Sequence, residues 1–193
     1  MNIISGIAGG IRLNVPKGIK VRPTSGRARK ALYDSIRDFK DKTIVDLFAG
    51  SGALGLEAAS RGATRIMFVE KERSFCKNIK ENIIKIENSG IDCRFDLICG
   101  DASNATLFCR PGMAVDIVFA DPPYPISGEC FQRLGSDKKF AQWLGDAKLI
   151  WEFPDTGDHD GSFLTAKYLQ VKQRRNFGGT TFIFAERRVD HSY

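Results

Sequence analysis

The chain has 193 residues, of which 42% are hydrophobic and 27% charged, and its net charge is +6. This length and composition fit one domain with a buried core and argue against a disordered chain. No stretch reaches the apolar length of a membrane span, and residues 1–10 lack the features of a secretory signal, so we expect a cytoplasmic protein without membrane contact.

The cysteine and histidine content does not indicate a metal site or a disulfide framework. Five cysteines are present, an odd number, and no two of them form a C-x-x-C pair. This usage favours reduced thiols scattered through a core. The two histidines, His159 and His191, are far apart in the sequence. We therefore expect no bound metal ion.

The positive charge is concentrated near the N-terminus. Residues 1–33 contain seven basic side chains and no acidic one, so this segment carries the net positive charge of the chain. The basic residues are Arg12, Lys17, Lys20, Arg22, Arg27, Arg29 and Lys30. Such a local excess of cations favours an anionic partner, above all a nucleic-acid backbone, although a solvated surface is the alternative.

The predicted elements begin with a short hairpin in the first twenty residues, which mix β-branched residues with glycines. Residues 27–39 carry apolar side chains at helical spacing, and Thr24 or Ser25 can cap that helix. From residue 43 onward, strands and helices alternate. Strands are expected at 43–47, 65–70, 94–99, 115–120 and 148–153, and helical segments at 53–60, 73–86, 103–109 and 130–144.

This alternation predicts an α/β fold with a doubly wound, mostly parallel, Rossmann-like sheet of seven strands. The last two extended segments, 163–173 and 180–186, have no helix between them and must form an antiparallel hairpin. We expect residues 1–24 to form a basic N-terminal hairpin extension and residues 25–193 to form the main α/β domain.

A glycine-rich loop joins the first strand of this series to its helix. Gly50, Gly52 and Gly55 fit the pattern G-x-G-x-x-G between a strand and a helix, and Glu70 ends the next strand, where an acid can bind ribose hydroxyls. These features alone suggest a dinucleotide such as NAD. Asp46, at the end of the first strand, argues against a pyrophosphate. A ligand with a ribose and an ammonium group, S-adenosylmethionine, fits better, and a glycine turn without a ligand is the structural alternative.

The same predicted cofactor site includes further residues. Phe48 and Ser51 belong to the glycine loop, while Asp101 and Ala102 follow the third strand, where they can bind the adenine amino group. A solvated carboxylate is the alternative for Glu70 and Asp101 taken singly.

The tetrapeptide Asp121-Pro122-Pro123-Tyr124 ends the fourth strand, which in a doubly wound sheet lies beside the first. Proline cannot continue a ladder, so the motif stops the strand. The Asp121 carboxylate and the Pro122 carbonyl can also accept the N–H groups of a planar amine, and Asp121 can take its proton. Tyr124 offers a face for an unstacked base. The motif is typical of methyltransferases that act on nucleobases, glutamine or other planar amines.

The whole chain resembles the RsmD-type 16S ribosomal RNA guanine-N2 methyltransferases. The resemblance rests on Val21-Arg22-Pro23-Thr24 with the basic helix after it, on the block from Asp46 to Ala58, on Glu70 and on Asp121–Tyr124. It implies that residues 25–193 form a class I S-adenosylmethionine-dependent methyltransferase domain that modifies the exocyclic N2 of one guanine, and that the extension at residues 1–24 contacts RNA. It also implies 16S rRNA within the small ribosomal subunit, or an assembly intermediate, as the partner; we expect a monomer.

Carried over position by position, the resemblance implies two sets of functional residues. Cofactor positions are matched by Asp46, Gly50, Gly52, Glu70 and Asp101, and target-base positions by Asp121, Pro122 and Tyr124. Our candidates for contacts with RNA are Arg12, Lys17, Lys20, Arg22, Arg27 and Arg29. The hairpin sequence Gly9-Gly10-Ile11-Arg12 is less basic than is common in the family.

Two other functions remain open from the sequence. Asp-Pro-Pro-Tyr also occurs in DNA adenine methyltransferases, so a DNA or RNA adenine-N6 methyltransferase is the second enzymatic hypothesis. A non-catalytic RNA-binding assembly factor is the third.

Overall fold

In the computed structural model, residues 1–16, 26–36, 38–154, 166–177 and 179–189 are described. Their core is one seven-stranded sheet in the order β3-β2-β1-β4-β5-β7-β6. The strands are β1 (Thr43–Leu47), β2 (Arg65–Glu70), β3 (Arg94–Cys99), β4 (Ile117–Ala120), β5 (Lys148–Pro154), β6 (Leu169–Asn176) and β7 (Thr180–Arg187). The predicted doubly wound sheet is confirmed.

The strand pairing brings the carboxyl ends of the parallel strands to one edge of the sheet. β1 pairs in parallel with both β2 and β4, and β4 with β5. β7 runs antiparallel to β5 and β6, and its first residue, Thr180, lies opposite Pro154 at the end of β5. The carboxyl ends of the parallel strands and the β6–β7 turn therefore share one edge, where ligands bind in sheets of this type.

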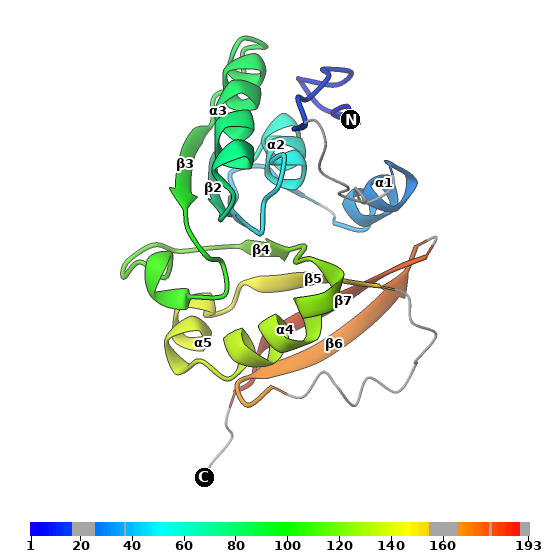
Figure 1. The fold of residues 1–193 in the computed structure, drawn as a ribbon. Helices are drawn as coiled ribbons and strands as arrows, with labels where there is room; N and C mark the ends of the chain where they lie inside the picture. Colours follow the sequence, from blue (N-terminus) through cyan, green and yellow to red (C-terminus); the bar gives the residue numbers. More distant parts are fainter. Residues whose placement is uncertain (17–25, 37, 155–165, 178, 190–193) are drawn as a thin grey trace.

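Helices cover both faces of the sheet (Figure 1). One face carries α1 (Gly26–Asp34), α2 (Ala53–Ser60) and α3 (Arg73–Glu87); the other carries the 3₁₀ turn η1 (Ala105–Leu107), α4 (Ser127–Gly135) and α5 (Lys138–Leu144). A further 3₁₀ turn, η2 (Tyr124–Ile126), follows β4. Two hydrophobic clusters fill the spaces on either side of the sheet. No described helix is long and apolar enough to cross a membrane.

Some predicted helices differ in length from those observed. The segment 130–144 is interrupted, because the Asp137 side chain accepts hydrogen bonds from the backbone N–H groups of Lys139 and Phe140 and so starts a second helix. The predicted helix 27–39 ends at Asp34, and Phe39 reaches the core separately, with its ring centroid 5.2 Å from that of Tyr33. The strand expected at 115–120 begins at residue 117, and the helical segment 103–109 is reduced to η1.

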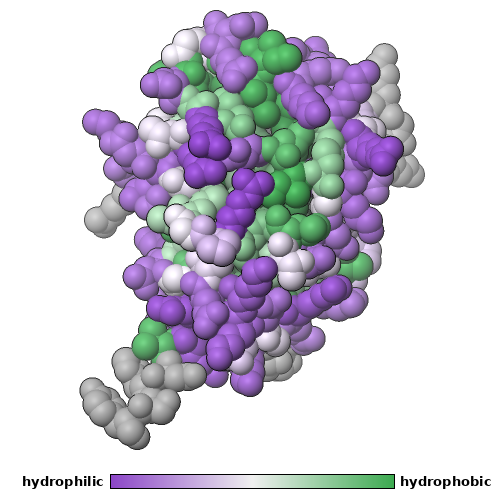
Figure 2. Space-filling view, turned by 90° about the vertical axis from the view of Figure 1, so that its left-hand side faces the viewer, coloured by the Kyte–Doolittle hydropathy of each residue, from purple (hydrophilic) through white to green (hydrophobic). Residues whose placement is uncertain are grey.

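β3 is the edge strand on the left of Figure 1, the side of the molecule that faces the viewer in Figure 2, where polar side chains surround a band of apolar atoms. Phe95 and Leu97 of this strand pack partly exposed against the core. Asp96 forms an ion pair with Arg65 of β2, with 2.8 Å between the charged atoms, and a longer one with Arg94. Charged side chains of this kind discourage an edge strand from pairing with another chain.

The N-terminal segment, residues 1–13, is held on α2. The predicted hairpin is reduced to one antiparallel bridge between Asn2 and Arg12. The buried Glu57 accepts hydrogen bonds from the backbone N–H groups of Ile4 (2.6 Å) and Ser5 (3.1 Å). Ile3, Ala8 and Leu13 of the segment are buried in the cluster that contains α2. The expected domain boundary between residues 24 and 25 lies outside the described residues and stays a prediction.

Gly6 is the position at which this attachment is most sensitive to substitution. It has a φ of +84°, and a Cβ would lie 1.8 Å from the carbonyl oxygen of Ser60, whereas Gly10, with a φ of +88°, has open space around it. We expect Gly6→Ala to lower the free energy of unfolding by about 2–4 kcal/mol and Gly10→Ala by about 1 kcal/mol, the cost of backbone strain alone. Urea denaturation and hydrogen exchange at the Ile7 amide measure the two effects; equal losses would contradict the packing argument.

Candidate active site

A cavity of about 1300 Å³ opens at the carboxyl ends of β1, β2 and β4. It brings together most of the predicted site. The predicted residues that line it are Asp46, Phe48, Gly50, Ser51, Glu70, Asp101, Ala102, Asp121, Pro122, Tyr124 and Arg29. Gly52 does not line it; this residue precedes α2 with a φ of +77°, and its α-carbon faces Phe68 and Ile79.

The glycine loop follows a path that few side chains permit. Phe48 has a φ of +58° and Gly50 one of +54°, so the chain is left-handed at two positions of the cavity wall. A non-glycine residue held in this region is a form of strain that clusters at functional sites. Gly55 serves packing instead, because a Cβ there would lie 2.4 Å from Cε1 of Phe68, so glycine allows α2 to lie directly on β2.

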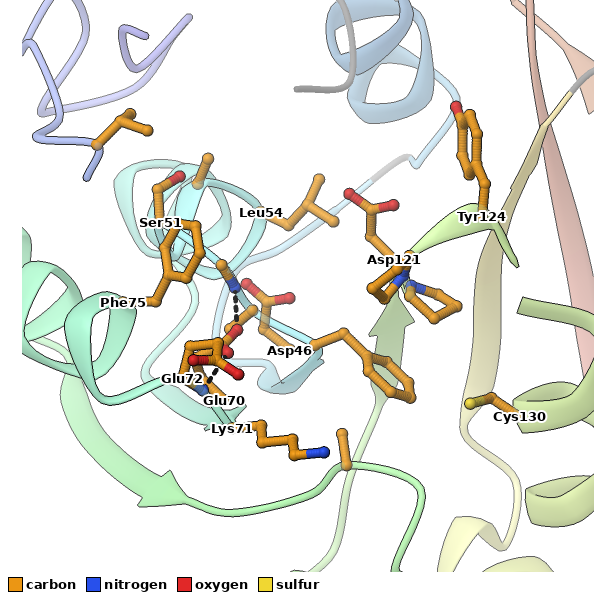
Figure 3. Close-up of a pocket in the computed structure, with 18 of the residues that line it drawn as sticks. Asp46, Ser51, Leu54, Glu70, Lys71, Glu72, Phe75, Asp121, Tyr124 and Cys130 are labelled. Atoms are coloured by element: carbon orange, nitrogen blue, oxygen red, sulfur yellow. Dashed lines mark hydrogen bonds between the residues drawn. The ribbon is translucent and has the colours of Figure 1, made fainter. Parts of the chain in front are cut away.

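Glu70 is fixed at the end of β2 as a hydrogen-bond acceptor. Its Oε2 accepts from the Gly50 N–H at 2.7 Å and its Oε1 from the Glu72 N–H at 2.7 Å, the two bonds drawn in Figure 3. A carboxylate offers about four lone-pair positions, so each oxygen can accept one bond more. Glu70 is thus placed to bind a pair of hydroxyl groups.

Asp46 is buried under the loop, with 1% of its surface exposed. Its Oδ2 accepts a hydrogen bond from the Gly55 N–H at 2.8 Å, which ties β1 to the start of α2. Burial raises the pKa of Asp46 to about 8, against the smaller opposing effect of this bond, and the negative charge of Glu70 adds to the rise. A cationic group of a ligand beside Asp46 would favour its ionised form.

The raised pKa of Asp46 makes stability depend on pH in a defined direction. The unfolded chain ionises this carboxyl near pH 3.8, whereas the folded chain keeps the proton until about pH 8. Its contribution to stability is therefore complete below pH 3.8 and is lost as the pH rises to 8. At about 1.4 kcal/mol per pKa unit, Asp46→Asn is expected to gain up to about 5 kcal/mol relative to the wild type between about pH 4 and about pH 8.

Urea denaturation of both proteins at several pH values measures this difference. A stability difference that does not change with pH would contradict the assignment of the buried proton to Asp46.

Asp101 and Ala102 form another wall, after β3. Asp101 Oδ1 accepts a hydrogen bond from the Ser103 N–H at 2.9 Å, and this bond is the main reason that the pKa of Asp101 is lowered. The Asp101 side chain is exposed, whereas Ala102 is buried. An ionised acceptor with a fixed direction is available here for an amino group.

Asp121, Pro122 and Tyr124 lie across the cavity from Glu70, on the side where α1 passes (Figure 3). The Asp121 N–H donates to the carbonyl oxygen of Leu47, which ties the ends of β4 and β1 together. Pro122 is buried, and the Tyr124 hydroxyl contacts Glu152 of β5 at 3.4 Å. Burial raises the pKa of Tyr124, so its phenol is neutral near pH 7. The carboxylate and the ring therefore face the same space.

The predicted RNA contacts are distributed differently from the expectation. Arg12 and Arg27 lie toward the surface, as such contacts require, while Lys17, Lys20 and Arg22 lie outside the described residues. Arg29 is only 3% exposed and donates to the Asn2 carbonyl oxygen at 2.9 Å. Its guanidinium lines the cavity, so the expectation of a surface contact is wrong for this residue.

Several cavity residues escaped the sequence analysis. Met1, Asn2, Ile3 and Ile4 form part of the wall, together with Leu54 and Phe75. Phe75, at the start of α3, could have been found from its position after β2. The N-terminal wall had no sequence signal, because its contacts with α2 join residues more than fifty positions apart. The described residues contain no cluster of three or more His, Cys, Asp or Glu side chains suited to a metal ion.

The strand order, the antiparallel hairpin that closes the sheet and the cavity at the carboxyl edge define the fold of a class I S-adenosylmethionine-dependent methyltransferase. The chain is similar to a putative methyltransferase, yhhF, from Escherichia coli, with 25% identity, a TM-score of 0.70 and 97% of each chain covered. It is also similar to a hypothetical protein from Thermus thermophilus, with 28% identity, a TM-score of 0.72 and coverage of 96% and 99%.

A family model described as "Conserved hypothetical protein 95" matches residues 1–186. The chain belongs to this family, which is the RsmD family. Over 159 residues it is 35% identical to the ribosomal RNA small subunit methyltransferase D of Escherichia coli K12, a match that covers 78% of this chain and 73% of the relative. A putative rRNA methyltransferase of Bacillus subtilis is 31% identical over 64% of this chain and 67% of its own length.

Proposed function

We propose that this protein transfers a methyl group from S-adenosylmethionine to the exocyclic N2 of a guanine in the RNA of the small ribosomal subunit. The observation that carries the proposal is that one cavity holds both the Gly50–Glu70 pair and the Asp121-Pro122-Pro123-Tyr124 strand end. A cofactor and a planar amine would then meet inside a shared space.

The residues present fit this cofactor. Glu70 has acceptor capacity left for two ribose hydroxyls, Asp101 has it for the adenine amino group, and Asp46 is a buried acid for an ammonium group. The loop at Phe48 and Gly50 lets the backbone approach the ligand closely. When bound, S-adenosylmethionine supplies a methyl group on a positively charged sulfur.

The strand end would prepare the acceptor nitrogen. The lone pair of an aromatic amino group is delocalised into its ring. The protein must therefore orient the nitrogen by accepting a hydrogen bond from each of its two N–H groups. The Asp121 carboxylate and the Pro122 carbonyl provide two such acceptors, and the consecutive prolines hold them rigidly. Asp121 then accepts the proton that the amine releases. Tyr124 supports the base on its ring face.

The RNA would approach across the edge that carries the cavity. Arg12 and Arg27 offer cations on the N-terminal side. Two further cations support the same role: Arg174 is exposed near the end of β6, and Arg175 lies over the ring of Phe184 at 5.3 Å. The strand register puts this end of the hairpin beside Pro154, at the same edge of the sheet as the cavity.

We infer further that the substrate is the assembled or assembling subunit in the cytoplasm, and that the protein acts as a monomer. A folded subunit presents one guanine among many at a fixed distance from phosphates on both sides, which suits separated patches of cations. Methylation of subunits but not of naked RNA in matched assays would support this inference, and the reverse would contradict it.

The decisive experiment is incubation with labelled S-adenosylmethionine and undermethylated small subunits, followed by mapping of the label by mass spectrometry. We expect one methyl group on N2 of one guanine. Label on an adenine, on duplex DNA in a parallel reaction, or on a protein side chain would overturn the proposal.

A further inference from the structure

Arg29 contains buried donors that the fold leaves unused. The side chain is 3% exposed and one nitrogen, Nη2, donates to the Asn2 carbonyl oxygen. Its Nε and Nη1 are buried and have no hydrogen-bond partner within the described ranges of the chain. Burial lowers the pKa of Arg29, but a guanidinium keeps its charge in proteins. A buried cation with two unpaired nitrogens calls for an acceptor from outside the chain.

The nearby acid does not supply that acceptor. Glu57 is close enough to Arg29 to affect its pKa, yet it accepts no hydrogen bond from Arg29 Nε or Nη1; its oxygens accept from Ile4, from Ser5 and from the Arg61 Nε at 2.8 Å. Among the described residues, two other buried side-chain nitrogens lack a partner, in Trp143 and Arg187. Neither of those residues lines the cavity, whereas Arg29 does.

A chain of contacts links Arg29 to the Asp46 end of the cavity. Tyr33 follows Arg29 by one helical turn on α1, and its hydroxyl donates to the Leu54 carbonyl oxygen at the start of α2. The next residue, Gly55, donates its N–H to Asp46. The charges of both Asp46 and Arg29 act on the pKa of Tyr33. A buried cation and a buried acid are therefore both close enough to one tyrosine to affect its pKa, and both line the same cavity.

We propose that Arg29 binds the α-carboxylate of the methionine part of S-adenosylmethionine, with Asp46 facing the ammonium group on the same carbon. An amino-acid end carries these two opposite charges side by side, which is the pattern that Arg29 and Asp46 offer. The proposal rests on the proposed cofactor. It also accounts for the burial of Arg29: a small ligand can be enclosed behind Asn2, whereas a phosphate of an RNA chain remains at the mouth of a cavity.

Two ligands that differ only at the amino-acid end test the proposal. S-adenosylhomocysteine carries the carboxylate and the ammonium group; 5′-methylthioadenosine has the same nucleoside and thioether sulfur but lacks both. Calorimetry should show that Arg29→Met weakens binding of S-adenosylhomocysteine at least tenfold and changes binding of 5′-methylthioadenosine less than twofold. Arg29→Lys, which keeps the charge but loses the planar fork, should fall between Arg29→Met and the wild type.

Lys30→Met is the matched control, because Lys30 is exposed on the same helix and pairs with Asp34 at 2.6 Å. It should bind both ligands like the wild type. The thermal midpoint of Arg29→Met shows whether the variant is folded, because the loss of the bond to the Asn2 carbonyl and the removal of unpaired buried donors act in opposite directions. If Arg29→Met does not fold, the comparison is made with Arg29→Lys.

Two results would overturn the proposal: unchanged affinity of Arg29→Met for S-adenosylhomocysteine, or an equal loss for both ligands. Unchanged affinity combined with lost methyl transfer to subunits would assign the guanidinium to the RNA. A wild-type protein that binds neither ligand would instead refute the proposed cofactor, so the two failures are distinguishable.

Discussion

Asp121→Asn is expected to lower the rate of methyl transfer at saturating cofactor and subunits by a factor of about 10² to 10⁴. The amide keeps the size of the carboxylate but cannot take the proton released by the amine. Its NH₂ group would also face an N–H donor of the substrate. Because Asp121 lies across the cavity from Glu70, the affinity for S-adenosylhomocysteine should stay within about twofold of the wild type, since no cofactor contact is removed.

Asp146→Asn provides the control for this measurement, since Asp146 is fully exposed and remote from the cavity lining. Both variants are compared by single-turnover transfer to undermethylated subunits and by calorimetry. A protein that serves only as an RNA-binding assembly factor would retain its effect on subunits when Asp121 is replaced. Retained turnover in Asp121→Asn would remove this carboxylate from the mechanism.

Glu70→Gln is expected to act on binding rather than on the chemical step. Each oxygen of Glu70 accepts a backbone N–H, from Gly50 and from Glu72. An amide has one oxygen only, so its NH₂ group must face one of these donors and the loop loses its fixed shape. We expect the affinity for S-adenosylhomocysteine to fall about 10- to 100-fold, equivalent to about 1.4–2.7 kcal/mol.

The kinetic signature separates this variant from Asp121→Asn. Glu70→Gln should raise the KM for S-adenosylmethionine and leave kcat within a few-fold of the wild type. Glu87→Gln, on the exposed end of α3, is the control and should alter neither. A fall in kcat without a change in KM would mean that Glu70 acts in the transfer itself.

Much of the fold follows from local sequence patterns. The bounds predicted for residues 43–47, 53–60, 65–70 and 94–99 match β1, α2, β2 and β3, because short apolar runs there end at clear turn signals. The division between α4 and α5 was missed because apolar periodicity continues through it. Only the capping bonds of Asp137 mark the break. In a sequence, one capping residue is a weaker signal than apolar periodicity that continues through it.

The candidate site, like the fold, could be predicted only in part from local sequence patterns. Strand ends with unusual residues, such as Asp46, Glu70 and Asp121, could be predicted because parallel strands bring their carboxyl ends together. Arg29 was misplaced, since its charge and its position in a basic segment resemble those of exposed neighbours. Its burial depends on the N-terminal segment that packs over it, and this packing is a long-range contact.

The position of β4 between β1 and β5 has a consequence for the protein during its synthesis. The strands β1, β2 and β3, with the acids Asp46 and Glu70 that line the cavity, are translated first, and β4 with Asp121 follows them. Until β4 has emerged, β1 has a partner on one side only, and its buried row of apolar residues forms an open sheet edge. A nascent chain of that length is a template for aggregation, and the edge of β1 is covered only when β4 pairs with it.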